Sequence, residues 1–266
     1  MEPLASSNPK IKRLRRLAGR RSSRVEERAF VIEGPTNVRE ALRSGVVLEA
    51  CFVDQYASPP QWLDHEVTPV ASGVLQQILS TETPQPICAI AATTLHRPMA
   101  DVVELTRARQ RPMLVCVDLG DPGNAGTLIR TAEAAGAAGV VFAGRSVDPY
   151  NPKVVRSSAG SIFRTPFSVI AEMDEVFAAL DGIESWAATG TDGVAHIDAP
   201  LERCHALLLG NEAHGLAPEL VERCSGRITI EMDGPTESLN VAMAGTVLLF
   251  ESMRQRRTAV DHNGAR

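Results

Sequence analysis

Short apolar runs recur along the second half of this chain, separated by segments of mixed polarity. Six runs are predicted to be strands: residues 113–119, 139–143, 167–170, 186–189, 207–209 and 228–232. Four segments are predicted to be helices: residues 127–137, 152–164, 174–180 and 239–256. A continuous apolar run such as 113–119 is typical of a parallel strand that is buried on both faces. The alternation therefore predicts an α/β fold with a mostly parallel sheet and helices on both faces.

The first half of the chain predicts a smaller alternating α/β unit. Its expected strands are residues 30–34, 46–53 and 87–91, and its expected helices are 10–28, 36–43 and 72–79. Thr36 is the expected N-cap of the helix 36–43, and residues 1–9 are expected to be disordered. Residues 93–112 hold two prolines and four arginines, so a linker is expected there. The predicted domains are residues 1–105 and 113–266, with the linker at 106–112.

The distribution of charge changes the picture that net charge alone would suggest. The chain has a net charge of -5, which disfavours nucleic acid as a partner. However, residues 1–28 hold nine Lys and Arg against three Glu, so this segment carries +6 and the remainder -11. A basic arm on an acidic body suits phosphate groups, and a solvated helix or a disordered tail remains the alternative.

Composition excludes several classes of protein. No apolar run approaches the roughly 18 residues that span a bilayer, and the basic N-terminus has no apolar stretch behind it, unlike a secretory signal. The five cysteines are odd in number and never spaced as C-x-x-C, which argues against a disulfide scaffold or a zinc site. A cytoplasmic protein with buried thiols, no membrane contact and no metal is expected.

Polar loops follow several of the predicted strands, at the edge where parallel sheets bind ligands. Four loops have this placement: residues 120–126, 189–193, 210–215 and 233–238. A nicotinamide site is disfavoured, because the first loop lacks G-x-G-x-x-G and contains Pro122. Arg130, expected near the start of the following helix and flanked by Leu128, Ile129 and Ala132, is expected to be less solvated than most arginines. It would be either a salt-bridge partner or a fixed cation for phosphate or ribose oxygens. Glu212 would be either a helix cap or a partner of an arginine or ligand, and Ser238 either an N-cap or part of a polar site.

Three segments in these loops resemble the motifs of one family. Residues 121–132, which include Asn124 and Arg130, resemble the first motif of the SpoU (TrmH) branch of the SPOUT RNA methyltransferases. Residues 209–216 resemble the second motif, and residues 230–242 resemble the third. The order and spacing also agree. The N-terminal half is similar, more loosely, to the ribosomal-protein L30e-like domain of many such enzymes.

The resemblance implies a deep trefoil knot, a homodimer whose sites are completed at the subunit interface, and S-adenosylmethionine as cofactor. It implies methylation of a ribose 2'-hydroxyl in RNA, with ribosomal RNA favoured and transfer RNA possible. It assigns the catalytic site to Arg130, Asn124, Glu212, Ser238 and Asn240. It assigns cofactor contacts to Thr189, Gly190, Leu209, Gly210, Asn211, Ile230, Met232, Ser238 and Leu239. Because a guanidinium has a pKa above about 12, Arg130 is expected to stabilise the developing alkoxide rather than to act as a base. It is expected to be oriented by phosphate and by Glu212.

Two rivals remain within the same fold. An RNA-binding relative without catalysis would have degraded cofactor loops, whereas the loops of this chain are intact. A base methyltransferase of another SPOUT branch would lack the pair Asn124 and Arg130, which is present. The sequence therefore favours a ribose methyltransferase.

Overall fold

The computed structural model describes residues 2–79, 85–236 and 238–264, with the backbone alone for 260–264. The chain forms two compact units. The N-terminal unit comprises Met1–Leu95 and Asp148–Arg164, and the C-terminal unit comprises His96–Val147 and Thr165–Arg266. The chain therefore leaves the C-terminal unit at residue 147, contributes a segment to the N-terminal unit, and returns at residue 165.

The N-terminal unit is built on a four-stranded sheet of order β1-β4-β2-β3. Its strands are β1 (Ala29–Glu33), β2 (Leu48–Asp54), β3 (Val67–Val70) and β4 (Ile87–Ala92). Helix α1 (Pro9–Gly19) places Ile11, Leu14 and Leu17 in its hydrophobic core, since residues three apart share one side of a helix. All three of these side chains are fully buried.

The basic segment is folded into this unit, which corrects two predictions. The single helix expected at 10–28 is two helices, α1 and α2 (Arg21–Glu27), because Arg20 has an extended backbone. The expected disorder of residues 1–9 is wrong for the described residues 2–9, where Leu4 exchanges backbone hydrogen bonds with Pro69 and Ala71 at 2.9 and 3.0 Å. The segment is therefore a structured basic surface and not a free arm.

Two further local predictions fail at helix starts and turns. Helix α3 (Pro35–Arg43) begins one residue before Thr36, so Gly34 and not Thr36 is its N-cap. Residues 72–79, expected to be a helix, form consecutive turns. Strand β3 was not predicted, because it contains Pro69 and only its last residue is buried.

Residues 148–164 pack into the N-terminal unit through charged and aromatic contacts. The Arg24 guanidinium pairs with Asp148 at 2.7 Å, and both side chains are nearly buried. The ring of Tyr150 lies 4.9 Å from that of Phe30, and Glu33 pairs with an arginine of the segment at 2.8 Å. The helix predicted at 152–164 is divided into α6 (Pro152–Ser157) and the 3-10 helix η1 (Ser161–Phe163), because the two residues at 159 and 160 are left-handed.

The C-terminal unit contains a seven-stranded sheet of order β7-β6-β5-β10-β8-β11-β9, in which every neighbouring pair is parallel. Its strands are β5 (Met113–Val117), β6 (Gly139–Ala143), β7 (Phe167–Ile170), β8 (Glu184–Ala188), β9 (Val194–Ala195), β10 (His205–Leu209) and β11 (Gly226–Thr229). The predicted α/β class with a mostly parallel sheet is confirmed. The two-residue strand β9 was not predicted.

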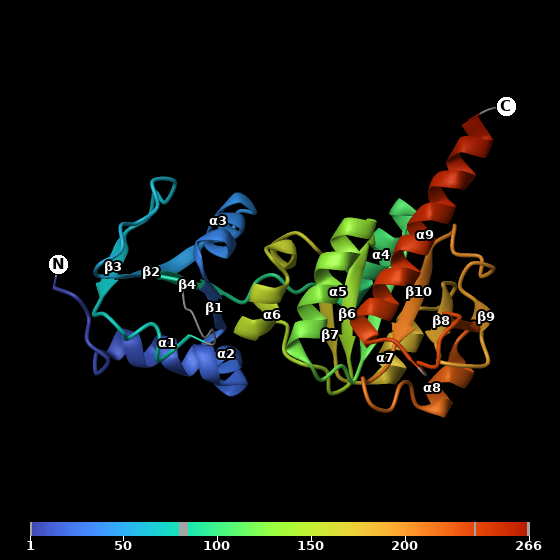
Figure 1. Cartoon of the computed structure of the whole chain (residues 1–266), viewed down its shortest axis with the longest axis horizontal. Helices are drawn as coiled ribbons and strands as arrows, with labels where there is room; N and C mark the ends of the chain where they lie inside the picture. Colours follow the sequence, from blue (N-terminus) through green and yellow to red (C-terminus); the bar gives the residue numbers. More distant parts are fainter. Residues whose placement is uncertain (1, 80–84, 237, 265–266) are drawn as a thin grey trace. The chain divides into compact units, whose positions relative to one another are not determined.

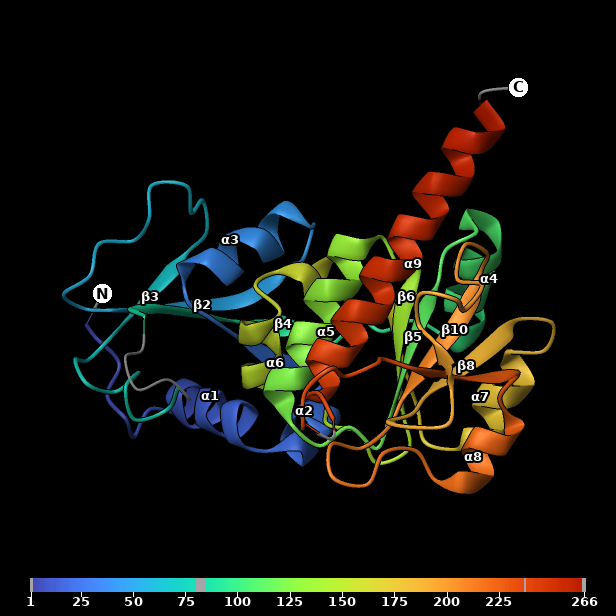
Figure 2. The same ribbon diagram turned by 45° about the vertical axis from the view of Figure 1, so that its right-hand side comes forward.

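Helices cover both faces of this sheet, as Figures 1 and 2 show. One face carries α5 (Pro122–Ala135) and α9 (Val241–Gly264), which pack on each other. They meet closely at Gly245, where a Cβ atom would lie 2.5 Å from Leu128 and 2.7 Å from Leu209. The other face carries α4 (Met99–Arg109), α7 (Met173–Ala179) and α8 (Pro218–Arg223).

Helix α4 occupies most of the stretch that was expected to be a linker. Pro98 precedes its first residue, a position that proline tolerates well, and the buried face of the helix includes Val102 and Val103. Its arginines lie on the exposed side, which gave the segment its polar character. Among the described helices, none is both long enough and apolar enough to cross a membrane.

Candidate functional site

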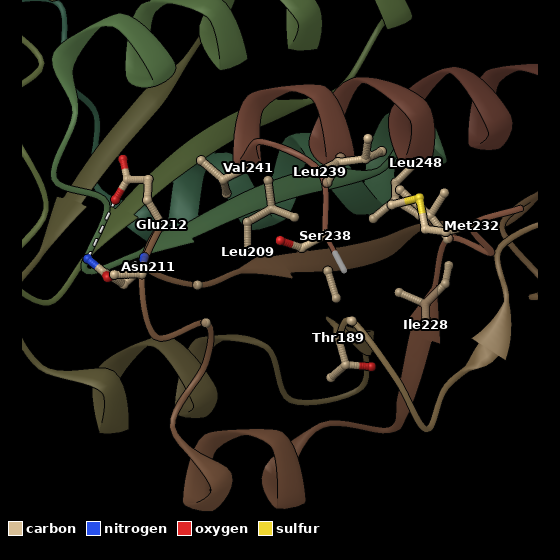
Figure 3. Close-up of a pocket in the computed structure, with 17 residues that line it drawn as sticks. Thr189, Leu209, Asn211, Glu212, Ile228, Met232, Ser238, Leu239, Val241 and Leu248 are labelled. Atoms are coloured by element: carbon tan, nitrogen blue, oxygen red, sulfur yellow. Dashed lines mark hydrogen bonds between the residues drawn. The ribbon is translucent and has the colours of Figure 1, made fainter. Parts of the chain in front are cut away.

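A cavity of about 280 Å³ lies in the C-terminal unit where β8, β10 and β11 end, beside the start of α9 (Figure 3). All nine residues predicted to contact a cofactor line it: Thr189, Gly190, Leu209, Gly210, Asn211, Ile230, Met232, Ser238 and Leu239. Three loops that are distant in sequence thus wall one space. This position agrees with the rule that parallel sheets bind ligands beyond the carboxyl ends of their strands.

The wall of the cavity includes apolar side chains and one buried hydroxyl group. Leu209, Ile228 and Leu248 supply apolar surface from two strands and a helix (Figure 3). The hydroxyl oxygen of Thr189 is buried and has no hydrogen-bond partner among the described residues. Buried polar groups are normally hydrogen-bonded, so the Thr189 hydroxyl is an exception. The apolar side chains of the wall suit a flat apolar ring such as that of a nucleoside.

The loop after β10 is closed on itself. Asn211 and Gly215 exchange two backbone hydrogen bonds of 3.0 and 2.9 Å. The side-chain oxygen of Asn211 accepts hydrogen bonds from the backbone of Ala213 at 2.9 Å and His214 at 3.3 Å. A Cβ atom on Gly210 would overlap the backbone of Gly215, so only glycine fits there. The loop is therefore a fixed wall of the cavity.

Glu212 joins this loop to the first motif. Its carboxylate accepts hydrogen bonds from the backbone N–H of Asp121 at 2.8 Å, from that of Gly120 at 3.1 Å, and from the side-chain amide of Asn124 at 3.1 Å. Burial, the largest single influence, raises the pKa of Glu212. The amides of Asp121 and Gly120, with Asn124, together outweigh it and hold the pKa below its ordinary value. Glu212 is therefore a structural anion that organises two loops.

Asn240 connects the third motif to the same network. Its side-chain amide donates to the Asn124 carbonyl oxygen at 3.1 Å, and its own oxygen accepts from the backbone of Ala242 at 2.9 Å. Asn240 therefore caps α9, whereas Ser238, the alternative N-cap in the sequence, lines the cavity instead. The chain of contacts Glu212–Asn124–Asn240 unites the three motifs.

Asn124 lies in a helix and not in a loop, contrary to the prediction. Helix α5 begins at Pro122, because the Asp121 side chain accepts a hydrogen bond from the backbone of Asn124 at 2.9 Å and so caps the helix. Proline is favoured at the first helical position. Asn124 is thereby fixed in the first turn, beside Glu212.

Arg130 lies apart from the cavity and is exposed, so the prediction that it is poorly solvated is wrong. Its neighbours Leu128, Ile129 and Ala132 are buried, but residues one or two apart do not share a helix face. Its guanidinium has no ion-pair or hydrogen-bond partner among the described residues. Arg130 is thus available to a group that approaches α5 from outside.

The sequence did not single out the cavity residues that α9 contributes. Val241, Ala244 and Leu248 line the cavity. The sequence instead suggested an apolar face of Ala242, Thr246, Leu249 and Met253 at helical spacing, and of these Ala242 and Leu249 are buried in the core. The spacing of three and four residues between the three lining positions was the available signal. Within the described residues, no group of three or more His, Cys, Asp or Glu could hold a metal ion.

Comparison with known proteins places this fold and site in one class. The family model of the SpoU rRNA methylases matches residues 111–250, and that of an MRM3-like substrate binding domain matches residues 8–89. The chain therefore belongs to the SpoU rRNA methylase family, and the family predicted from the three motifs is confirmed.

Similar proteins give the family a chemical context. The chain is 31% identical over 251 residues to the 23S rRNA (guanosine(2553)-2'-O)-methyltransferase RlmP of Bacillus subtilis, covering 92% of this chain and 96% of RlmP. It is 30% identical to the 23S rRNA (uridine(2479)-2'-O)-methyltransferase of Streptomyces viridochromogenes, covering 95% and 92%. A crystal structure of the SpoU methyltransferase AviRb from that organism, with the cofactor AdoMet, superposes with a TM-score of 0.83 at 26% identity, covering 94% of this chain and 99% of AviRb.

Proposed function

We propose that this protein transfers a methyl group from S-adenosylmethionine to a ribose 2'-hydroxyl of 23S-type ribosomal RNA. The observation that carries the proposal is the cavity at the ends of β8, β10 and β11, which is walled by the second and third motifs. Hydrogen bonds from Asn124 join the first motif to the other two. The two relatives described above act on 23S rRNA, and family membership supports the same reaction class. Transfer RNA is the alternative substrate.

The cavity residues fit S-adenosylmethionine. Leu209, Ile228 and Leu248 would pack against its adenine ring, with Thr189 in the same wall of the cavity. Gly210 lets the backbone of Gly215 pack closely against it, which keeps this wall of the cavity in place. When bound, the cofactor supplies an electrophilic methyl group on a sulfonium. The residues of the chain hold it, exclude water and orient the nucleophile.

Catalysis is assigned to the network at the start of α5. Positioning of the hydroxyl in line with the methyl group contributes several kcal/mol, and Asn124 and Asn240 are held rigidly enough for that task. Because Arg130 lies apart from the cavity of its own chain, it would stabilise the alkoxide in the site of a partner subunit as the hydroxyl loses its proton. The exposure of Arg130 corrects the expected contact with Glu212, since Glu212 bonds instead to Gly120, Asp121 and Asn124.

A homodimer would bring a second chain close to Arg130, which has no partner among the described residues of its own chain. Met243 and Phe250 are 50% and 40% exposed and lie seven residues apart on α9, so they share one face of the helix. Exposed apolar stripes of this kind commonly mark a protein interface. The knot is a further part of the proposal: β10 lies between β5 and β8, two strands that precede it in the chain, as a threaded topology requires.

RNA would bind first through the basic surface of α1 and α2. Lys12, Arg15 and Arg21 are exposed and have no ion-pair partner among the described residues. Their number and proximity suit the phosphate backbone. The two relatives act on different nucleotides of 23S rRNA. Action on ribosomal RNA also supports the cytoplasm as the site of function.

The decisive experiment follows tritium from labelled S-adenosylmethionine into unmodified ribosomal RNA and, separately, transfer RNA. Alkali cannot cut next to a 2'-O-methyl group, so label in alkali-resistant dinucleotides is the expected result with ribosomal RNA. Label in mononucleotides would mean base methylation and would refute the ribose assignment. Label in transfer RNA alone would favour the alternative substrate.

The role of Arg130 has its own test. Arg130→Lys keeps a positive charge but removes the planar fork of donors, so a fall in kcat of at least tenfold with unchanged cofactor affinity is expected. A variant with near-full kcat would show that a point charge suffices and that the guanidinium geometry is not required.

A further inference from the structure

Asp118 forms the corner at which the chain leaves β5, and the motif residues do not include it. Its backbone is left-handed, with φ of 51°. Residues with a side chain adopt this conformation rarely, and Asp and Asn tolerate it best. Such a conformation persists when surrounding contacts hold it in place, and it is frequent near functional sites.

The side chain of Asp118 ties this corner to the loop after β6. Its carboxylate accepts a hydrogen bond from the backbone N–H of Arg145 at 2.6 Å, and its own N–H donates to the Ala143 carbonyl at 3.1 Å. A Cβ atom on Gly144 would overlap the Asp118 carboxylate. Asp118 and Gly144 are therefore matched: a carboxylate on one strand end fills the space that glycine leaves on the next.

The carbonyl of Asp118 points to the loop that walls the cavity. It accepts a hydrogen bond from the side-chain amide of Asn211 at 2.9 Å. The side-chain oxygen of Asn211 accepts hydrogen bonds from the backbone N–H groups of Ala213 and His214. The direction of one backbone carbonyl thus determines where Asn211 lies, and Asn211 determines the shape of loop 211–215.

We propose that Asp118 is a positioning residue for the methyl transfer: its left-handed corner aims the carbonyl that holds Asn211, and so fixes the cofactor-facing wall of the cavity. Asp118 itself does not line the cavity, so it acts through Asn211. The inference rests on the proposed function, because it assigns Asp118 to the binding of that cofactor.

Three substitutions separate the backbone from the side chain. Asp118→Asn keeps an acceptor for Arg145 and tolerates the left-handed backbone, so S-adenosylmethionine should bind within about twofold of wild type. Asp118→Gly keeps the backbone but loses the acceptor, and Asp118→Ala loses both. The Kd for S-adenosylmethionine should therefore rise in the order Asn, Gly, Ala, reaching roughly 10- to 100-fold for Ala. Gly144→Ala should raise the same Kd by displacing the carboxylate.

The kinetic constants distinguish positioning of the cofactor wall from a general loss of structure. KM for S-adenosylmethionine should rise more than kcat falls, while the affinity for RNA stays within about twofold. Asp54→Ala is the matched control, because the Asp54 carboxylate likewise accepts a backbone N–H, that of Tyr56 at 3.0 Å, after β2 in the N-terminal unit. Melting temperatures of all variants are compared, and binding is measured below the lowest.

The outcomes are distinct. Equal cofactor affinity in Asp118→Ala and wild type overturns the proposal, and so does an equal loss in Asp54→Ala. If Asp118→Ala does not fold, Asp118→Gly and Gly144→Ala decide the question by the same measurement. Wild-type protein that binds no S-adenosylmethionine would refute the proposed function itself, whatever the variants show.

Discussion

Gly210 offers the sharpest test of the cavity, because the structure leaves no room for a side chain there. In Gly210→Ala, the added Cβ overlaps the backbone of Gly215 and Leu216. The loop must then move, and the two backbone hydrogen bonds between Asn211 and Gly215 cannot both survive. Two such bonds contribute about 2 kcal/mol, and overpacking adds about 1–3 kcal/mol. The total cost is therefore about 3–5 kcal/mol, divided between folding and cofactor binding.

The assay for Gly210→Ala combines calorimetric binding of S-adenosylmethionine with thermal unfolding. A share of about 3 kcal/mol in binding corresponds to a roughly hundredfold higher Kd. Gly234→Ala is the control in a neighbouring loop, because a Cβ atom at Gly234 meets no atom within 4 Å, and it should bind like wild type. If Gly210→Ala has wild-type Kd and melting temperature, the loop is soft and the argument from close packing is refuted.

Three further predictions follow from the charged groups. The pKa of Glu212 is lower in the folded protein than its ordinary value near 4.5, so its contribution to stability is present above that pH and is lost as pH falls through the lowered pKa. The melting temperature should fall between about pH 5 and about pH 3 by more in wild type than in Glu212→Gln, and parallel curves would contradict this. Arg24→Met leaves Asp148 buried without its partner, so the free energy of unfolding of the N-terminal unit in urea should fall by about 3–5 kcal/mol, with cofactor binding retained. A fall below about 1 kcal/mol would show that this ion pair does not stabilise the unit. Lys12→Gln with Arg15→Gln should reduce the slope of log K for RNA against log salt by about 0.7–0.9 per residue, whereas Arg223→Gln, which removes an arginine paired with an aspartate, should leave the slope unchanged.

The sheet of the C-terminal unit was predictable because its strands are buried on both faces. Runs such as Met113–Val117 and Gly139–Ala143 are apolar throughout, so burial and sequence pattern coincide. Strands β3 and β9 lack this signal, since most of their residues are partly exposed and the strands are short. The pattern of hydrophobic residues therefore predicts the central strands of a sheet better than its edge strands.

The loops that form the site could be predicted, but the start of helix α5 and the direction of the Arg130 side chain could not. The polar loops of the cavity could be located because they follow strands, and the family resemblance named nine of the lining residues. The lining residues Ala244 and Leu248 lie on α9 and were not named. The start of α5 was misjudged, because Pro122, Gly123 and Asn124 are typical turn residues, and a single side-chain cap from Asp121 outweighs them. The exposure of Arg130 depends on helical phase, which the identity of its immediate neighbours does not report.

The excursion of residues 148–164 bears on how such a protein could be divided or assembled from parts. Asp148, Tyr150 and Val154 are supplied by the C-terminal half of the sequence yet belong to the N-terminal unit. A fragment beginning at residue 96 would therefore retain residues 148–164 without the N-terminal residues against which they pack. Val154 and its neighbours, which are buried in the whole chain, would be exposed. Replacing the first 95 residues by another domain would meet the same difficulty. The two units are separate in structure but not separable by a single cut, so exchange of substrate-binding domains requires this segment to change together with the N-terminal half.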